Sequence, residues 1–429
     1  MLARLDLRGF TGDLAASLAR HDAPAIDADQ ALESVRAIIA DVRARGDTAL
    51  REYAKRFDGC EVDDLRVPAQ EMSAALDAVE PSFRAALEYA RDEITVYHEQ
   101  QIAPPIALDR DGVRTWEIVV PVDRAGGYVP GGLANYPSTV LMTAIPARVA
   151  GVAEIVLCVP PGRDGKIPTA TLAAAALAGV DEVYRVGGAQ AIAALAYGTE
   201  TIPAVDVLYG PGNMYVALAK REVAGVVRTD DAGPSELVVV ADGDAPAELV
   251  AADLLAQAEH GPGGAAVLVT WSEKTATAVD DAVVRLMSEA PRRAEIESTL
   301  STGGRTILVD GPEQAMAVSN EIAPEHLQLV VTDPESLLPL VRNAGAVFCG
   351  LWAPAVIGDY VAGVNHVLPT GRTARFASAL RVDDFCKHIH VVDLDEAALT
   401  RVAPHIRAFA KAEGLPAHGR SVELRVGGK

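Results

Sequence analysis

The sequence predicts an α/β protein with two parallel-sheet units, for three reasons. From residue 138 onward, short apolar runs alternate with helical patterns, which is typical of parallel strands covered by helices on both faces. These strand-like runs are too many for one small sheet. Half of the 429 residues are hydrophobic, so the chain is long and apolar enough to bury more than one core.

The expected elements follow from the period of the apolar residues. Helical spacing begins early, over residues 27–57 and 69–101, and residues 115–120 resemble a strand. The later strand-like runs are 154–159, 182–186, 205–209, 237–241, 265–270, 306–309, 328–331 and 346–349. Helical patterns lie between most of them, at 168–179, 189–197, 213–224, 247–259 and 334–344.

The C-terminal segment differs from this alternation. A strand-like run at 389–392 leads into one amphipathic helix at 396–413, and a polar, strand-like tail follows. Such an appendage on a large α/β core is typical of a segment that docks on a partner subunit.

Composition excludes several classes of protein. The formal charge of −21 would repel phosphate backbones and anionic membrane surfaces, so we expect neither a nucleic acid nor a membrane as partner. The N-terminus shows no signal-peptide core, and prolines interrupt the uncharged stretch 125–147. The isolated cysteines include Cys158 and Cys349 in apolar runs, which indicates reduced, buried thiols in a cytoplasmic protein. Any metal would then rely on nitrogen and oxygen ligands.

Glycine-rich turns are the first candidate binding features. They cover residues 126–132, 187–190 and 210–213, and the last two directly follow predicted strands and precede predicted helices. Open α/β sheets bind ligands at such loops, where glycine lets backbone N–H groups approach a phosphate. Tight strand-to-helix turns also need glycine for structural reasons alone, and the chain lacks the common dinucleotide and Walker patterns. The turns therefore indicate a ligand site without naming the ligand.

Acidic and imidazole side chains form the second set of candidates. Glu325 and His326 lie side by side after a proline and before an apolar run, which is a candidate centre for acid–base chemistry. Gln257 and His260 are three residues apart and share a helix face, although a histidine at a helix end is more often a cap. From spacing alone Glu259 is the more obvious oxygen donor, but it lies elsewhere around the helix.

These segments together resemble the histidinol dehydrogenase family over nearly the whole chain. The resemblance is carried by 127–132, 136–142, 187–199, 210–213, 232–236, 257–260, 323–327, 358–360, 365–370 and 413–418. It implies two incomplete Rossmann-like domains with small N- and C-terminal appendages. The expected division is an N-terminal appendage at 1–26, a first domain from 27–127 and 237–380, a second at 128–236, and a dimerisation segment at 381–429.

The resemblance also implies a zinc-dependent oxidation of L-histidinol to L-histidine through the aldehyde, with NAD as hydride acceptor, in the last steps of histidine biosynthesis. It assigns each role to residues of this chain. One zinc ion per subunit would be bound by Gln257, His260, Asp359 and His418. NAD would contact Tyr128, Gln190 and Asn213. Substrate would be held by Ser235, His366 and Glu413 in addition to the metal ligands and His326. Glu325 and His326 would transfer protons.

The same resemblance implies a homodimer in which the C-terminal segment is exchanged, so that Glu413 and His418 serve the other subunit's site. The segment 226–231 departs from the family pattern just before Ser235. Alternative hypotheses are a related dehydrogenase for another amino alcohol or polyol, a catalytically silent metal-binding protein, and a metal hydrolase. The retained Glu413, His366, Glu325 and His326 favour histidinol oxidation, and the hydrolase motifs are absent.

Overall fold

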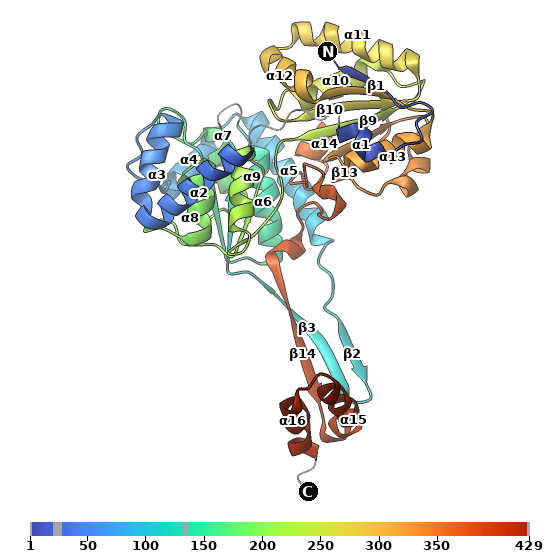
Figure 1. The fold of residues 1–429 in the computed structure, drawn as a ribbon. Coiled ribbons are helices and arrows are strands. Elements are labelled where there is room, and N and C mark those ends of the chain that lie inside the picture. The colour runs from blue at the N-terminus through green and yellow to red at the C-terminus, as the bar shows by residue number, and fades with distance from the viewer. Residues whose placement is uncertain (1, 20–27, 132–134, 427–429) are drawn as a thin grey trace.

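The computed structural model describes residues 2–19, 28–131 and 135–426. In that part of the chain the strands form a six-stranded, a five-stranded and a three-stranded sheet. The two larger sheets are parallel and helix-covered, and they lie side by side (Figure 1). The predicted α/β class is confirmed. The end of the expected N-terminal appendage and Gly132 of the first glycine turn lie outside the described residues.

The five-stranded sheet has the order β6-β5-β4-β7-β8. Its strands are β4 (Arg124–Tyr128), β5 (Glu154–Val159), β6 (Glu182–Arg185), β7 (Val207–Tyr209) and β8 (Arg228–Thr229). They are connected by α6 (Pro137–Ala150), α7 (Thr169–Leu177), α8 (Gly188–Tyr197) and α9 (Met214–Val223). From β4 the chain adds β5 and β6 on one side and then β7 and β8 on the other side. The carboxyl ends of β4 and β7 therefore form the topological switch point at which such sheets bind ligands.

The N-terminal helices cover this same sheet. They are α2 (Ala28–Arg45), α3 (Asp47–Tyr53), the π-helical turn η1 (Ala54–Asp58), α4 (Ala69–Ala78) and α5 (Pro81–Glu99). Helix α2 packs on α8 and α9, α4 on α7, and α5 on α6. Buried Val35 and Leu50 belong to the same apolar cluster as Ile192 and Val216. The expected division grouped residues 27–127 with 237–380, whereas these contacts place the helices with the other sheet.

The six-stranded sheet has the order β1-β11-β10-β9-β12-β13. Its strands are β1 (Ala3–Asp6), β9 (Glu236–Ala241), β10 (Ala265–Thr270), β11 (Gly304–Leu308), β12 (His326–Val330) and β13 (Ala346–Cys349). Strand β1 pairs with β11, so part of the expected N-terminal appendage is an edge strand. The surrounding helices are α1 (Leu14–Ala19), α10 (Ala247–Ala258), α11 (Glu273–Glu289), α12 (Arg293–Gly303), α13 (Pro312–Ile322), η2 (Glu335–Leu340), α14 (Val356–Tyr360) and η3 (Thr373–Arg375).

The third sheet is an antiparallel ribbon that extends away from both parallel sheets (Figure 1). It consists of β2 (Ala107–Arg110), β3 (Val113–Pro121) and β14 (Cys386–Leu394), which follows η4 (Val382–Phe385). Helices α15 (Glu396–Ala412) and α16 (Pro416–Val426) pack on each other at its far end. The C-terminal segment is thus an appendage, as expected, on a long stalk.

Local predictions were wrong at several places. The predicted helix at 334–344 is only a short 3-10 helix over Glu335–Leu340, and Pro339 within it disfavours an α-helix. The polar tail is helical rather than strand-like, since α16 packs on α15. Cys349 is exposed, although Cys158 is buried as expected. Among the described residues, no helix is long and apolar enough to cross a membrane.

Candidate active site at the amino edge of the six-stranded sheet

The acid–imidazole pair is placed by a sharp transition from helix to strand. Helix α13 ends at Ala323, whose positive φ of 53° is unusual for a residue with a side chain. Pro324 follows, and it can neither donate a backbone hydrogen bond nor continue the helix. The chain then enters β12, so Glu325 and His326 lie at the amino end of this strand. Both side chains are buried, at 7 % and 4 % exposure.

Glu325 is held by the start of the neighbouring strand β9. Its Oε2 accepts hydrogen bonds from the Ser235 hydroxyl at 2.5 Å and from the Glu236 backbone N–H at 2.8 Å. Burial raises the pKa of the Glu325 carboxyl, and the nearby His326 and these two donors oppose that shift. A carboxyl in such surroundings is suited to accept a proton from a bound molecule. Ser235 therefore lies directly beside the proposed acid–base pair.

His326 contacts the carboxylates of two separate segments. Its Nδ1 is 3.4 Å from Glu325 Oε2, and its Nε2 is 3.7 Å from Asp359 Oδ1. The ring packs near Phe348, with 5.9 Å between centroids. Gly358 makes this packing possible, because a Cβ there would lie 2.6 Å from the Phe348 ring. The Gly358-Asp359 sequence thus brings a carboxylate next to the imidazole.

The predicted metal ligands of this chain converge on one small hollow. Gln257 in the last turn of α10, His260 just after that helix and Asp359 in α14 all line it. The Gln257 Nε2 is buried and has no hydrogen-bond partner among the described residues. His260 Nδ1 is 3.1 Å from the Gln257 carbonyl oxygen, which leaves Nε2 as its free ligand atom. Asp359 thus joins Gln257 and His260 in space, although it follows them by about a hundred residues in the sequence.

His366 lies beside this hollow and links the two parallel-sheet units. Its Nδ1 is 2.9 Å from the Asp359 carbonyl oxygen, and its Nε2 is 3.2 Å from the Thr139 hydroxyl of α6. Burial lowers the pKa of His366, and the neighbouring His326 and His260 add to that effect while Asp359 opposes it. The neutral imidazole is thereby favoured.

Glu413 and His418 are not brought to the hollow within this chain. Glu413 caps the C-terminus of α15 and His418 lies in α16, at the far end of the ribbon (Figure 1). Among the described residues, no group of three or more His, Cys, Asp or Glu side chains is arranged to hold a metal ion. The predicted set supplies only His260 and Asp359 of those types from one chain, because its third local member is an amide.

The three residues predicted to contact NAD lie at the carboxyl edge of the five-stranded sheet. Tyr128 ends β4, Gln190 lies in the first turn of α8 after β6, and Asn213 caps α9 after β7. The buried Tyr128 hydroxyl accepts a hydrogen bond from the Gly188 N–H at 3.0 Å, which ties two of the glycine turns together. Asn213 Oδ1 accepts from Val216 N–H at 3.2 Å.

A cavity of about 400 Å³ opens at the same edge. Residues from the first glycine turn, from the end of β5 and from η1 line it, including Asp58, Pro130, Gly131, Asn135, Pro160 and Arg163. Burial raises the pKa of the Asp58 carboxyl to about 6. The cavity lies beyond the carboxyl end of β4, one of the two strands at the topological switch point. This is the expected place for a nucleotide in a doubly wound sheet.

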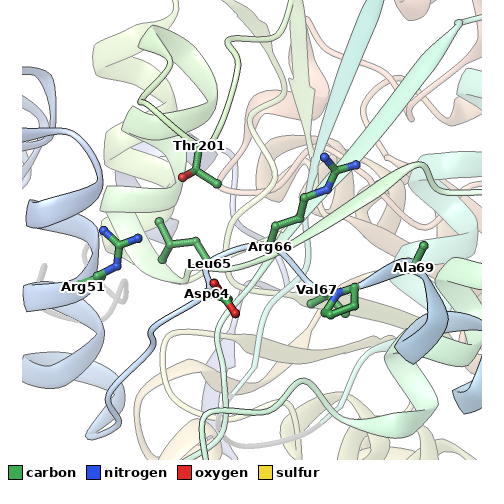
Figure 2. Close-up of a pocket in the computed structure, with 8 residues that line it drawn as sticks. Arg51, Asp64, Leu65, Arg66, Val67, Ala69 and Thr201 are labelled. Carbon is green, nitrogen blue, oxygen red and sulfur yellow. The ribbon is translucent and has the colours of Figure 1, made fainter.

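Another cavity, of about 440 Å³, is lined by Arg66, which forms a β-bridge with Tyr184 of the edge strand β6 (Figure 2). Arg51 and Arg66 flank it, with Asp64 and Thr201. Both guanidinium groups already pair with carboxylates, Arg51 with Asp47 and Arg66 with Glu182. We assign no role in the reaction to this surface.

Sequence patterns missed several residues around the site. Asp253 lines the hollow one helical turn before Gln257, and its carboxylate accepts from Gln328 Nε2 at 2.7 Å. The i, i+4 spacing on α10 was the available signal. No spacing pattern pointed to Thr139 or to the buried Lys220. Only the fold brings His366 to Thr139 and Asp230 to Lys220.

Fold and site together define a two-sheet α/β enzyme with a buried acid–imidazole pair. The family model described as histidinol dehydrogenase matches residues 21–426. Histidinol dehydrogenase of Synechococcus sp. is 50% identical over 396 residues, which cover 91% of each chain. The Syntrophotalea carbinolica enzyme of that name is 47% identical, with 99% of each chain covered.

A solved structure extends the same likeness to three dimensions. The crystal structure of histidinol dehydrogenase from Elizabethkingia anophelis has a TM-score of 0.93 and 35% identity, covering 100% of this chain and 98% of that one. This chain belongs to the histidinol dehydrogenase family and is an oxidoreductase.

Proposed function

We propose that the protein oxidises L-histidinol to L-histidine in two steps, with L-histidinaldehyde between them, at the end of histidine biosynthesis. The observation that carries this proposal is the convergence of Glu325, His326, Gln257, His260 and Asp359 at one edge of the six-stranded sheet. The acid–base groups would move protons of an alcohol. The neighbouring nitrogen and oxygen donors would hold a metal ion that binds the imidazole and the amine of the same substrate.

A zinc ion fits the donor set of the hollow. The donor types support this, because an imidazole nitrogen and a carboxylate oxygen are common zinc ligands and the Gln257 amide can offer its oxygen. Gln257, His260 and Asp359 would hold the ion, with His418 of the partner subunit as the fourth protein ligand. When bound, zinc would orient the substrate by ligating its imidazole and amine. Ser235, His366 and Glu413 would contact the rest of the substrate.

NAD fits the opposite side of the site. The cavity is lined by Pro130 and Gly131, just after Tyr128, and its lining residue Pro160 packs against Gly187, which precedes Gln190. When bound, NAD would accept the hydride that each oxidation releases. The connection from β8 to β9 is short, so the carboxyl edge of one sheet lies close to the amino edge of the other. Hydride donor and acceptor would meet at this junction.

The two proton-transfer residues have separate tasks. His326 takes the hydroxyl proton of the alcohol through Nε2 in the first oxidation. Glu325 takes a proton from the water that adds to the aldehyde carbonyl before the second oxidation. Glu325 must be a carboxylate to accept that proton, and the burial that raises its pKa makes it a stronger base.

A homodimer with exchanged C-terminal segments would complete the site. The ribbon and its helices expose large apolar side chains, among them Leu108, Ile389, Val392, Phe409 and Leu424. Such a surface on a stalk suits burial against a second subunit. This arrangement would carry Glu413 and His418 to the hollow of the other chain. We place the enzyme in the cytoplasm, in keeping with its free cysteines.

The test is absorbance at 340 nm with L-histidinol and NAD. We expect two NADH per histidinol consumed, loss of activity after chelation, and recovery when zinc is restored. One NADH per substrate, or activity unaffected by removal of all bound metal, would contradict the proposal. Other amino alcohols without an imidazole serve as matched controls and should react far more slowly.

A further inference from the structure

Lys220 is a buried cation in the interior of α9, with only 1 % of its surface exposed. Its ammonium group has three hydrogens and three acceptors. It donates to the Gly210 carbonyl oxygen at 2.9 Å, to the Ala232 carbonyl oxygen at 3.0 Å, and to the carboxylate of Asp230. All three hydrogens of the ammonium group are therefore used in hydrogen bonds.

The acceptors belong to two different loops of the proposed site. Gly210 begins the turn that leads to Asn213, on the NAD side. Asp230 and Ala232 belong to the connection that leads to Ser235, on the substrate side. Asp230 also accepts the Gly210 N–H at 2.8 Å through its other oxygen. The pair thus holds Gly210 at both its N–H and its carbonyl group.

Each loop is anchored again beyond this point. Gly210 has a φ of +128°, and a Cβ there would lie 2.1 Å from the Tyr128 carbonyl oxygen. Gly210 therefore packs directly on the end of β4. On the other loop, Gly233 N–H donates to the Thr370 hydroxyl at 2.7 Å. A shift at the Lys220–Asp230 pair would move one anchored loop relative to the other.

A buried ion pair is a poor source of stability, since desolvation offsets most of the attraction between its members. A pair of apolar residues would serve packing equally well. What a buried pair with directional hydrogen bonds supplies is a fixed geometry for the groups it joins. Hydride transfer is sensitive to that geometry, because a displacement of about 1 Å can lower a rate roughly a hundredfold.

We infer that Lys220 and Asp230 form a positioning pair that fixes the NAD-side loop relative to the substrate-side loop. The inference rests on the proposed function. It assigns a task to the segment 226–231, which departs from the family pattern, and to a lysine outside every predicted set of site residues. Lys220 touches neither ligand in this scheme and acts through Gly210 and Ala232.

The test compares two double variants of the zinc-loaded dimer. Lys220→Met/Asp230→Asn removes both charges, so no unpaired charge is left buried, and the asparagine can still accept from Gly210. Arg124→Met/Glu182→Gln is the matched control. It removes a largely buried pair from the opposite, amino edge of the same sheet, where Arg124 in β4 meets Glu182 in β6.

For the Lys220/Asp230 variant we expect kcat to fall about 10- to 100-fold, with the affinity for NAD changed less than threefold. The primary isotope effect with histidinol deuterated at the carbinol carbon should rise, because hydride transfer becomes slower than the other steps. The Arg124/Glu182 variant should lose comparable thermal stability yet keep its kcat and isotope effect. Equal kinetics in both double variants would overturn the inference.

Failure of the proposed function would show differently. The wild-type protein itself would then not oxidise histidinol, and kinetic comparison of the variants would not apply. In that case hydrogen exchange of the free protein tests the pair. Residues 210–213 and 231–235 should both exchange faster in the Lys220/Asp230 variant than in the control variant. Unchanged exchange at either loop would refute the coupling.

Discussion

The Nδ1 atom of His326 lies 3.1 Å from the backbone carbonyl oxygen of Glu236. A carbonyl oxygen can only accept, and the carboxylate of Glu325 on the same side is an acceptor too, so the proton of the neutral ring is on Nδ1. Nε2 then carries the lone pair and faces the side of Asp359 and the hollow. Backbone geometry at the start of β9 thereby selects the tautomer that a general base requires.

This tautomer predicts the effect of His326→Asn. The asparagine amide can still donate to the Glu236 carbonyl group, but no base remains at the position of Nε2. We expect kcat for histidinol oxidation to fall about 10²- to 10⁴-fold, with bound zinc unchanged. Metal analysis and the initial rate at 340 nm check both parts. Loss of zinc in this variant would mean that His326 is a ligand rather than a base.

Glu325→Gln should separate the two oxidations. The glutamine can still accept from Ser235 and Glu236, so the local structure is kept, but it cannot take a proton from water. We expect the first NADH to form while oxidation of added histidinaldehyde slows by about 10² or more. Glu321→Gln, a change in an exposed ion pair with Arg372, is the control and should retain both steps. Equal slowing of alcohol and aldehyde oxidation would contradict the division of roles.

His260→Asn tests the donor set of the hollow. Removing one of the nitrogen ligands should lower zinc affinity at least about tenfold, judged by the loss typical for altered metal sites. Metal content after dialysis against a chelator, compared with the wild type, measures this without an activity assay. His405→Asn, on α15 outside every proposed set, should bind zinc normally. Full zinc retention in His260→Asn would remove this residue from the site.

Subunit exchange can be tested by mixing two variants that are each blocked in the complete conversion of histidinol to histidine. Glu325→Gln alters the body of a subunit and Glu413→Gln alters its C-terminal segment. In a mixed dimer with exchanged segments, one site carries both changes and the other carries neither. Random reassociation of equal amounts should therefore restore about a quarter of wild-type histidinol-to-histidine activity. If each subunit used its own segment, both sites would stay defective and no activity would return.

Glu236 gives the stability a pH dependence. Burial and the neighbouring Glu325 raise its pKa from 4.5 to about 7, and its Oε2 has no hydrogen-bond partner among the described residues. Between these two values the folded state keeps a proton that the unfolded state has lost, so this carboxyl lowers stability as the pH rises. Above pH 7 the loss is complete.

Glu236→Gln should remove that loss, because its amide does not ionise. We expect the Tm of the variant, relative to wild type, to rise by roughly 2–5 °C between pH 5 and pH 8. Differential scanning calorimetry at several pH values measures this. Glu289→Gln, at an exposed position at the end of α11, should follow the wild-type curve. A constant difference between Glu236→Gln and wild type would show that Glu236 does not titrate in this range.

Local patterns predicted much of the fold because the spacing of apolar residues is a property of each element. The strands at 154–159 and 265–270 coincide with β5 and β10. Strand β4 was missed because Gly126 and Gly127 indicate a turn. In the sheet these positions require glycine, since an added Cβ would lie 3.0 Å from Val205 at Gly126 and 2.5 Å from Leu157 at Gly127. The helix α16 was missed because its packing partner, not its composition, stabilises it.

The sequence by itself determined which side chains are available: an adjacent carboxyl and imidazole at 325–326, an amide and imidazole one turn apart at 257–260, and glycine turns after parallel strands. Their short spacings are set by backbone geometry. Only the tertiary structure decided that Asp359 meets His326, and that the pair lies at the amino edge of its sheet. It also decided that Lys220 joins two loops. Such contacts depend on how distant elements pack, and no local periodicity encodes that packing.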